Sequence, residues 1–128
     1  MKRLFSSIIA LVFLSGCTAT PASRSQDSYQ KILDDAWEFQ MQSSPTWASS
    51  MGDRRWNDQL SDISAEGLQR SRNAAEVLVN RINNVAGSIT DNDKKINLAL
   101  LKRSMQEIVD QYDFKAHYMP LTSEWGFH

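Results

Sequence analysis

Apolar residues recur every three or four positions in three long stretches of the chain, which predicts three amphipathic helices. We expect these helices to run from Asp27 or Ser28 to about Ser43, from the cap residue Ser64 to Gly87, and from the cap residue Thr90 or Asp91 to about Asp113. The connection between the second and third of these helices is short, which favours antiparallel neighbours.

Each predicted helix has an apolar stripe that should face a common core. The three stripes are Tyr29, Ile32, Leu33, Ala36, Trp37 and Gln40; Leu68, Ala75, Leu78, Val79, Ile82 and Val85; and Ile96, Leu98, Leu101, Met105, Ile108, Val109 and Tyr112. Phe39 lies off the first stripe, so the first helix should contact neighbours on two sides.

A short helix should lie between the first two long ones. Pro45 suits its first position, and Gly52 suits the residue that ends it. Residues 53–62 show neither helical nor strand periodicity, which indicates a loop held by Trp56 and Leu60. The predicted fold class is therefore all-α, an antiparallel helical bundle of about three long helices plus one short helix.

The N-terminal pattern is that of a lipoprotein signal peptide. A positive start, Lys2 and Arg3, precedes an apolar run of eleven residues, 4–14, and small residues then lead to the single cysteine, Cys17. As a helix this run covers about 16 Å, against a bilayer core of about 30 Å, so it does not span. We expect residues 1–16 to be the signal peptide, cleavage between Gly16 and Cys17, and lipid attachment, palmitate included, at Cys17.

Residues 17–26, the acylated cysteine and a small, polar stretch with Pro21, have the composition of a flexible tether that should be disordered. Two or three acyl chains give stable membrane attachment. Thr18, in place of an acidic residue after the cysteine, favours the outer membrane, facing the periplasm, if the cell is Gram-negative. The alternative is an ordinary signal peptide cleaved within residues 19–22, which would discard Cys17.

Composition limits the remaining protein to one modest helical domain, residues 27–128. Removing 16 of the 128 residues leaves 112. Loss of Lys2 and Arg3 takes the 14 basic residues down to 12, against 15 acidic ones, so the net charge falls from −1 to −3. Without a basic tract, nucleic acid is not an expected partner. Acylation of Cys17 leaves no thiol for a disulfide.

No residue pattern after Cys17 predicts catalysis, a cofactor or a metal site. His117 and His128 lack a partner at metal-ligand spacing, and Asp110 and Asp113, although on one helix face, are best explained as solvated helix-end charges. The run 54–56, Arg-Arg-Trp, could bind a stacked or anionic ligand, but a loop with one buried aromatic residue is the simpler interpretation.

Four short motifs follow one another along the chain: Ser-Pro-x-x-Ala-x-x-x-Gly at 44–52, an Asp-rich loop ending Leu-Ser-Asp-Ile-Ser at 60–64, Met-Pro-Leu at 119–121, and Gly-Phe-His at 126–128. In this order they resemble the start of a bacterial lipoprotein family, domain of unknown function 885. The resemblance covers residues 27–128. The chain has Trp125 where the family more commonly has a second glycine.

This resemblance implies the N-terminal helical segment of a lipid-anchored, zinc-dependent peptidase-like protein. Zinc is implied only for the longer family members, because their His-Glu-x-x-His helix lies downstream of residue 128. The apolar, aromatic end of this chain, with Trp125 and Phe127, also suggests that a C-terminal portion is missing. The alternative is a complete small lipoprotein, a non-enzymatic binding or assembly module with Trp56 and Trp125 at a partner surface.

Overall fold

The computed structural model describes the backbone of residues 21–119 and the side chains of residues 28–119. Its α-helices are α1 (Pro21–Ser43), α2 (Pro45–Ser50), α3 (Ala65–Ala86) and α4 (Asn92–Asp113), and its 3-10 helices are η1 (Arg54–Trp56) and η2 (Ala116–Tyr118). No strand occurs in this part of the chain. The predicted all-α class, with three long helices and one short one, is confirmed.

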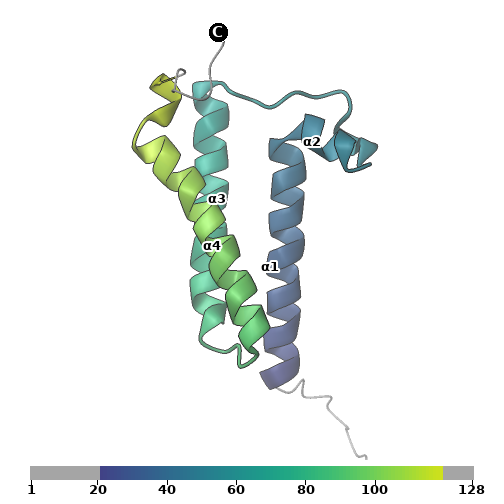
Figure 1. The fold of residues 1–128 in the computed structure, drawn as a ribbon, viewed down its shortest axis with the longest axis vertical. Coiled ribbons are helices and arrows are strands. Elements are labelled where there is room, and N and C mark those ends of the chain that lie inside the picture. Colours follow the sequence, from purple (N-terminus) through teal and green to yellow (C-terminus); the bar gives the residue numbers. More distant parts are fainter. Residues whose placement is uncertain (1–20, 120–128) are drawn as a thin grey trace, which may run out of the picture.

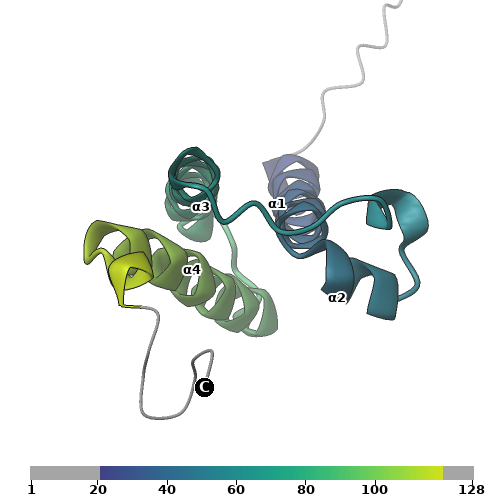
Figure 2. The same ribbon diagram turned by 90° about the horizontal axis from the view of Figure 1, so that it is seen from above.

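The three long helices run up, down and up (Figure 1). α3 and α4 form the most closely packed pair, and α1 packs beside α3. Figure 2 shows α2 on the side of α1 that is remote from α3. α4 begins next to α1, where Asn97 donates a hydrogen bond to the Tyr29 hydroxyl at 3.3 Å, and then diverges from α1 toward its C-terminal end (Figure 1).

Two adjoining clusters of buried side chains form the core where the helices meet. One contains Tyr29, Ile32, Ile82, Ile89 and Leu98, and the other contains Ala36, Ala75, Leu78, Val79, Met105 and Val109. Phe39 packs against the second cluster, so α1 does contact its neighbours beyond the predicted stripe. Burial of these apolar side chains is the main stabilising term available to a bundle with no disulfide in its described part.

Side-chain caps fix where α3 and α4 begin. The Ser64 hydroxyl accepts the Gly67 N–H at 3.0 Å, and the Asp91 carboxylate accepts the N–H groups of Asp93 and Lys94. These bonds satisfy amide groups that have no partner within the helix. Gly87 is the C-cap of α3, as predicted.

The predicted start of the first helix is wrong. α1 begins at Pro21, several residues before Asp27. Proline is well suited to a first helical position, because its missing N–H is not needed there. Residues 21–43 contain no glycine that would interrupt the helix. Residues 21–26, predicted to be a disordered tether, therefore belong to α1. Gly16 and Cys17 lie outside the described residues.

Gly67 should not tolerate a side chain. A Cβ built at this position would lie 2.6 Å from the backbone O of Asp62, whereas a Cβ at Gly87 would meet nothing within 4 Å. We expect Gly67→Ala to lower the free energy of unfolding by about 1–3 kcal/mol through this overlap. Gly87→Ala is the matched control and should be neutral or stabilise by about 0.4–1 kcal/mol. Urea unfolding measures both changes, and equal effects at the two glycines would contradict the assigned packing.

Candidate interaction surface

The carboxylates singled out on α4 do not act together. The Asp113 carboxylate accepts hydrogen bonds from Nε and Nη2 of Arg72, each at 3.1 Å, whereas Asp110 accepts one from the Gln106 side-chain amide at 2.9 Å. The Arg72 hydrogen bonds hold the pKa of Asp113 below its ordinary value. Asp113 therefore joins α4 to α3 and is not merely a solvated helix-end charge.

His117 is a packing residue in the described structure. Its ring stacks on Tyr112, with ring centroids 5.2 Å apart, and contacts Tyr118 at 4.4 Å. His128 lies outside the described residues. No group of three or more His, Cys, Asp or Glu side chains within the described residues is arranged to hold a metal ion.

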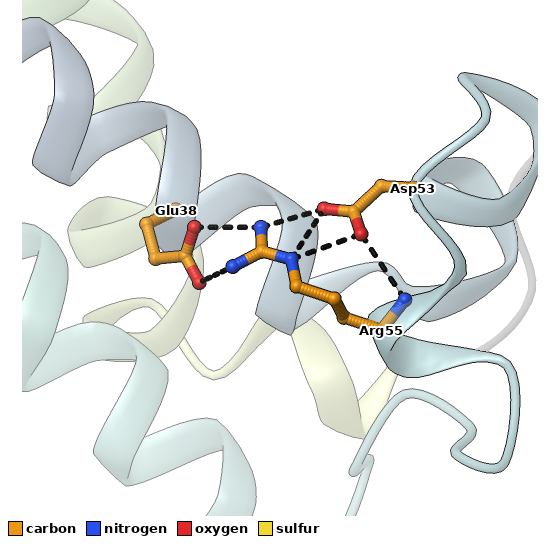
Figure 3. Close-up of polar contacts among 3 residues, drawn as sticks. All are labelled: Glu38, Asp53 and Arg55. Atoms are coloured by element: carbon orange, nitrogen blue, oxygen red, sulfur yellow. Dashed lines mark hydrogen bonds and ion pairs between the residues drawn. The ribbon is translucent and has the colours of Figure 1, made fainter.

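Arg55 joins the 53–62 loop to α1 (Figure 3). Its guanidinium donates to both Glu38 carboxylate oxygens at 2.9 Å, and it also pairs with Asp53, whose carboxylate accepts the backbone N–H of Arg55. These bonds raise the pKa of Arg55 and lower that of Asp53. An anionic ligand would have to displace two carboxylates from this arginine, which disfavours the anion-site hypothesis for residues 54–56.

Trp56 and Leu60, the two residues predicted to hold the loop, differ in burial. The Trp56 side chain is half-buried, its Nε1 is shielded from solvent with no hydrogen-bond partner, and the Arg55 guanidinium lies 5.7 Å from its ring. Leu60 is 81% exposed, so its predicted role in fixing the loop is wrong. The Arg55 ion pairs supply the attachment to α1 that Leu60 was expected to provide.

Acid should weaken the fold through its ion-paired carboxylates. Hydrogen bonds from Arg81, Arg55 and Arg72 lower the pKa values of Asp35, Asp53 and Asp113, respectively, below their ordinary 3.8. A depressed folded-state pKa contributes stability that is complete well above pH 3.8 and is lost as pH falls through the folded value. We expect the urea midpoint to decrease below about pH 4, and less steeply in Asp113→Asn. A midpoint that increases on acidification would contradict this account.

Trp37, which was expected in the core, forms an exposed aromatic pair with Trp47. Trp37 of α1 and Trp47 of α2 meet edge to face, with centroids 5.7 Å apart, and are 49% and 39% exposed. Met51, directly after α2, is also exposed. Placement of Trp37 in the core stripe is therefore wrong, because its ring packs against Trp47 of α2 and belongs to neither buried cluster.

A hollow of about 340 Å³ lies beside this pair, between α1 and α4. Its lining consists of Leu33, Ala36, Trp37, Gln40, Leu101, Ser104 and Met105. The lining contains no charged side chain. We call Trp37, Trp47, Met51 and this hollow the tryptophan face. Large aromatic side chains on a continuous apolar surface are typical of sites where proteins pack against one another.

Charged side chains elsewhere on the helices are largely paired with one another. Asp35 bridges Lys31 and Arg81, Arg72 contacts Glu76 and Asp113, and Arg103 pairs with Glu107. Such exposed pairs contribute little to stability. The tryptophan face differs from them in being aromatic and apolar. Helical spacing alone does not predict it, because spacing does not reveal which side of a stripe remains uncovered.

None of the helices in residues 21–119 combines the length and apolar character needed to cross a membrane. Comparison with family models, characterised proteins and solved structures finds no match to this chain, so the resemblance to domain of unknown function 885 stays a prediction.

Proposed function

We propose that this chain is a lipid-anchored envelope protein, attached through Cys17, whose helices form the N-terminal module of a larger zinc-dependent peptidase-like protein. The module itself is assigned no catalytic residue. Its role is to pack through the tryptophan face against the catalytic part of the same polypeptide. The exposed Trp37–Trp47 pair beside an uncharged hollow is the observation that supports this proposal most strongly.

The energetics of tryptophan favour a protein as the occupant of this face. Covering a half-exposed indole ring removes apolar surface from water, which lowers the free energy of the complex. Tryptophan is also enriched among the residues that dominate binding at interfaces. The hollow beside the two indole rings is lined by Leu33, Leu101 and Met105. Apolar side chains of a packed domain can insert into this hollow. Gln40 and Ser104 add hydrogen-bonding groups to the same lining.

The position of the face along α1 favours a protein over the bilayer. α1 has 23 residues and is therefore about 35 Å long. Its start, Pro21, follows the proposed anchor Cys17 by four residues, which span at most about 13 Å. Trp37 belongs to the second half of α1, and α2 lies at the C-terminal end of α1 (Figure 1). In this proposal α1 points away from the membrane, so that the tryptophan face is available to a protein partner.

Site-specific photo-cross-linking tests this proposal in native cells. A photoreactive phenylalanine analogue replaces Trp47, and Asn83, an exposed residue of α3, is the matched control position. We expect cross-linked peptides that join residue 47 to sequence downstream of residue 128, and none from residue 83. Absence of any cross-link at residue 47 would overturn the assigned role of the face.

The same exposed face also favours a second candidate, a complete small lipoprotein that binds a separate envelope protein. The cross-linking experiment separates the two. Under the second candidate, residue 47 joins to a different polypeptide, and the product is larger than the chain by the mass of that partner.

A further inference from the structure

A small hollow lies between the first half of α1 and the last turns of α3. It has a volume of about 190 Å³ and is lined by Ser28, Lys31, Ile32, Arg81, Asn84 and Val85. On each helix the lining residues occupy positions i, i+3 and i+4, which share one helix face. The hollow therefore forms where these two faces meet, and it is separate from the hollow of the tryptophan face between α1 and α4.

Every polar side chain that lines this hollow can donate hydrogen bonds. The lysine and the arginine are cationic and carry several N–H donors each, the serine contributes a hydroxyl, and the asparagine contributes an amide. Among the described residues, none that lines the hollow is acidic. Ile32 is 1% exposed and fixes this part of α1 in the core. A concave surface with two cations and further donors on a fixed backbone is suited to an anion.

Asp35 holds the two cations of the hollow side by side. Its Oδ2 atom lies 2.7 Å from Nη1 of Arg81, and its Oδ1 atom accepts a hydrogen bond from Nζ of Lys31 at 3.4 Å. Because two cations share one carboxylate, this group retains a net positive charge. Arg55, by contrast, faces two carboxylates and has no such excess. An anion can therefore bind beside Lys31 and Arg81 without displacing Asp35.

The size of the hollow and the arrangement of its donors favour a phosphate group. A volume of about 190 Å³ is below the roughly 300–1,000 Å³ of sites that bind drug-sized ligands. A carboxylate has two oxygens in one plane, which a single arginine can satisfy. A phosphate group has oxygens that point in several directions, and both arginine and lysine bind it in proteins. Donors from two helices can therefore contact different oxygens of one phosphate.

We propose that this hollow binds a phosphate group. Lys31 and Arg81 pair with its charge, and Ser28 and Asn84 donate hydrogen bonds to its oxygens. The ligand is inorganic phosphate or the phosphate of a lipid head group, since both present the same chemistry to these side chains. Asp35 is a positioning residue, which acts by orienting the two cations. The site uses a different surface from the tryptophan face and stands independently of the proposed function.

Nitrogen NMR of the full-length chain in neutral maltoside micelles tests the site. Sodium phosphate is titrated against sodium chloride at constant ionic strength, so that charge screening does not change during the titration. We expect saturable shifts of the Arg81 Nε signal and of the Asn84 side-chain amide. Arg81→Gln should raise the dissociation constant for phosphate by about tenfold or more, because it removes charged hydrogen-bond donors. Arg81→Lys should retain part of the affinity, because it keeps the charge.

Two further variants separate loss of the site from loss of the fold. Lys31→Gln changes a side chain that is 71% exposed, so it should leave the fold intact and still weaken phosphate binding. Arg103→Gln is the matched control, because Arg103 is an arginine of α4 that is likewise paired with a carboxylate, that of Glu107. It should leave the dissociation constant unchanged. Equal losses of affinity in Arg81→Gln and Arg103→Gln would overturn the proposal.

The same titration in bicelles of phosphatidylglycerol distinguishes the two sources of phosphate. If the lipid head group is the ligand, the bicelles themselves shift the Arg81 and Asn84 signals, and inorganic phosphate adds no further change. If free phosphate is the ligand, the bicelles leave both signals in place and the titration still saturates. Absence of a shift at either signal in both micelles and bicelles would show that the hollow binds no phosphate group.

Discussion

Replacing Cys17 with serine is expected to transfer nearly all of the protein from the membrane fraction to the soluble fraction. The reason is that each buried methylene of an acyl chain contributes about 0.8 kcal/mol to membrane binding, and two chains make the attachment stable. Serine lacks the thiol that accepts the diacylglyceryl group. Fractionation after a carbonate wash, together with incorporation of labelled palmitate, measures the change.

Thr18→Ser is the matched control for the Cys17 variant, because it alters the neighbouring residue and leaves the thiol in place. It should stay in the membrane fraction and take up palmitate. A Cys17→Ser protein that remains in the carbonate-washed membrane would show that something other than acylation holds the chain there. Palmitate uptake without Cys17 would point to the same conclusion.

Truncation of Ile82 is expected to produce a large loss of stability. Ile82 is 1% exposed and belongs to the core cluster that joins α1, α3 and α4. Ile82→Ala removes buried methyl and methylene groups and leaves a cavity, which costs about 2–5 kcal/mol in the free energy of unfolding. This is a large share of the roughly 5–15 kcal/mol that stabilises a typical domain. Urea unfolding followed by circular dichroism gives the difference.

Val77 provides the control on the same helix. It is 56% exposed, so Val77→Ala should change the free energy of unfolding by no more than about 0.5 kcal/mol. Similar losses for the two substitutions would mean that α3 does not bury the face assigned to it. A large loss at Val77 with little at Ile82 would reverse the assigned orientation of the helix.

Helix ends in the second half of the described chain are predictable because their signals are local. The side chains of Ser64 and Asp91 accept hydrogen bonds from backbone N–H groups two or three residues later, and Gly87 ends α3. A few adjacent residues are therefore enough to predict where these helices begin and end. The start of α1 is ambiguous for the same physical reason. A proline such as Pro21 fits both a flexible segment and a first helical turn, and composition alone favours the wrong one.

The candidate surface was harder to predict because it depends on how helices diverge in space. Periodicity placed Trp37 on the stripe of α1, but this side chain is 49% exposed and packs against Trp47 of α2. Ile96 lies on the predicted stripe of α4 and is also exposed, so its predicted burial is wrong. The Arg55–Glu38 pair joins a loop residue to a residue of α1 that lies 17 positions earlier, so no spacing rule reveals it.

The mass of the native protein tests the central proposal most directly. An immunoblot of the membrane fraction with an antibody raised against residues 64–112 detects whichever polypeptide carries α3 and α4. We predict a band several times heavier than the 14.6 kDa of this chain, as expected for a module at the N-terminus of a larger peptidase-like protein. A stable band slightly below 14.6 kDa would contradict that account and favour the small binding lipoprotein.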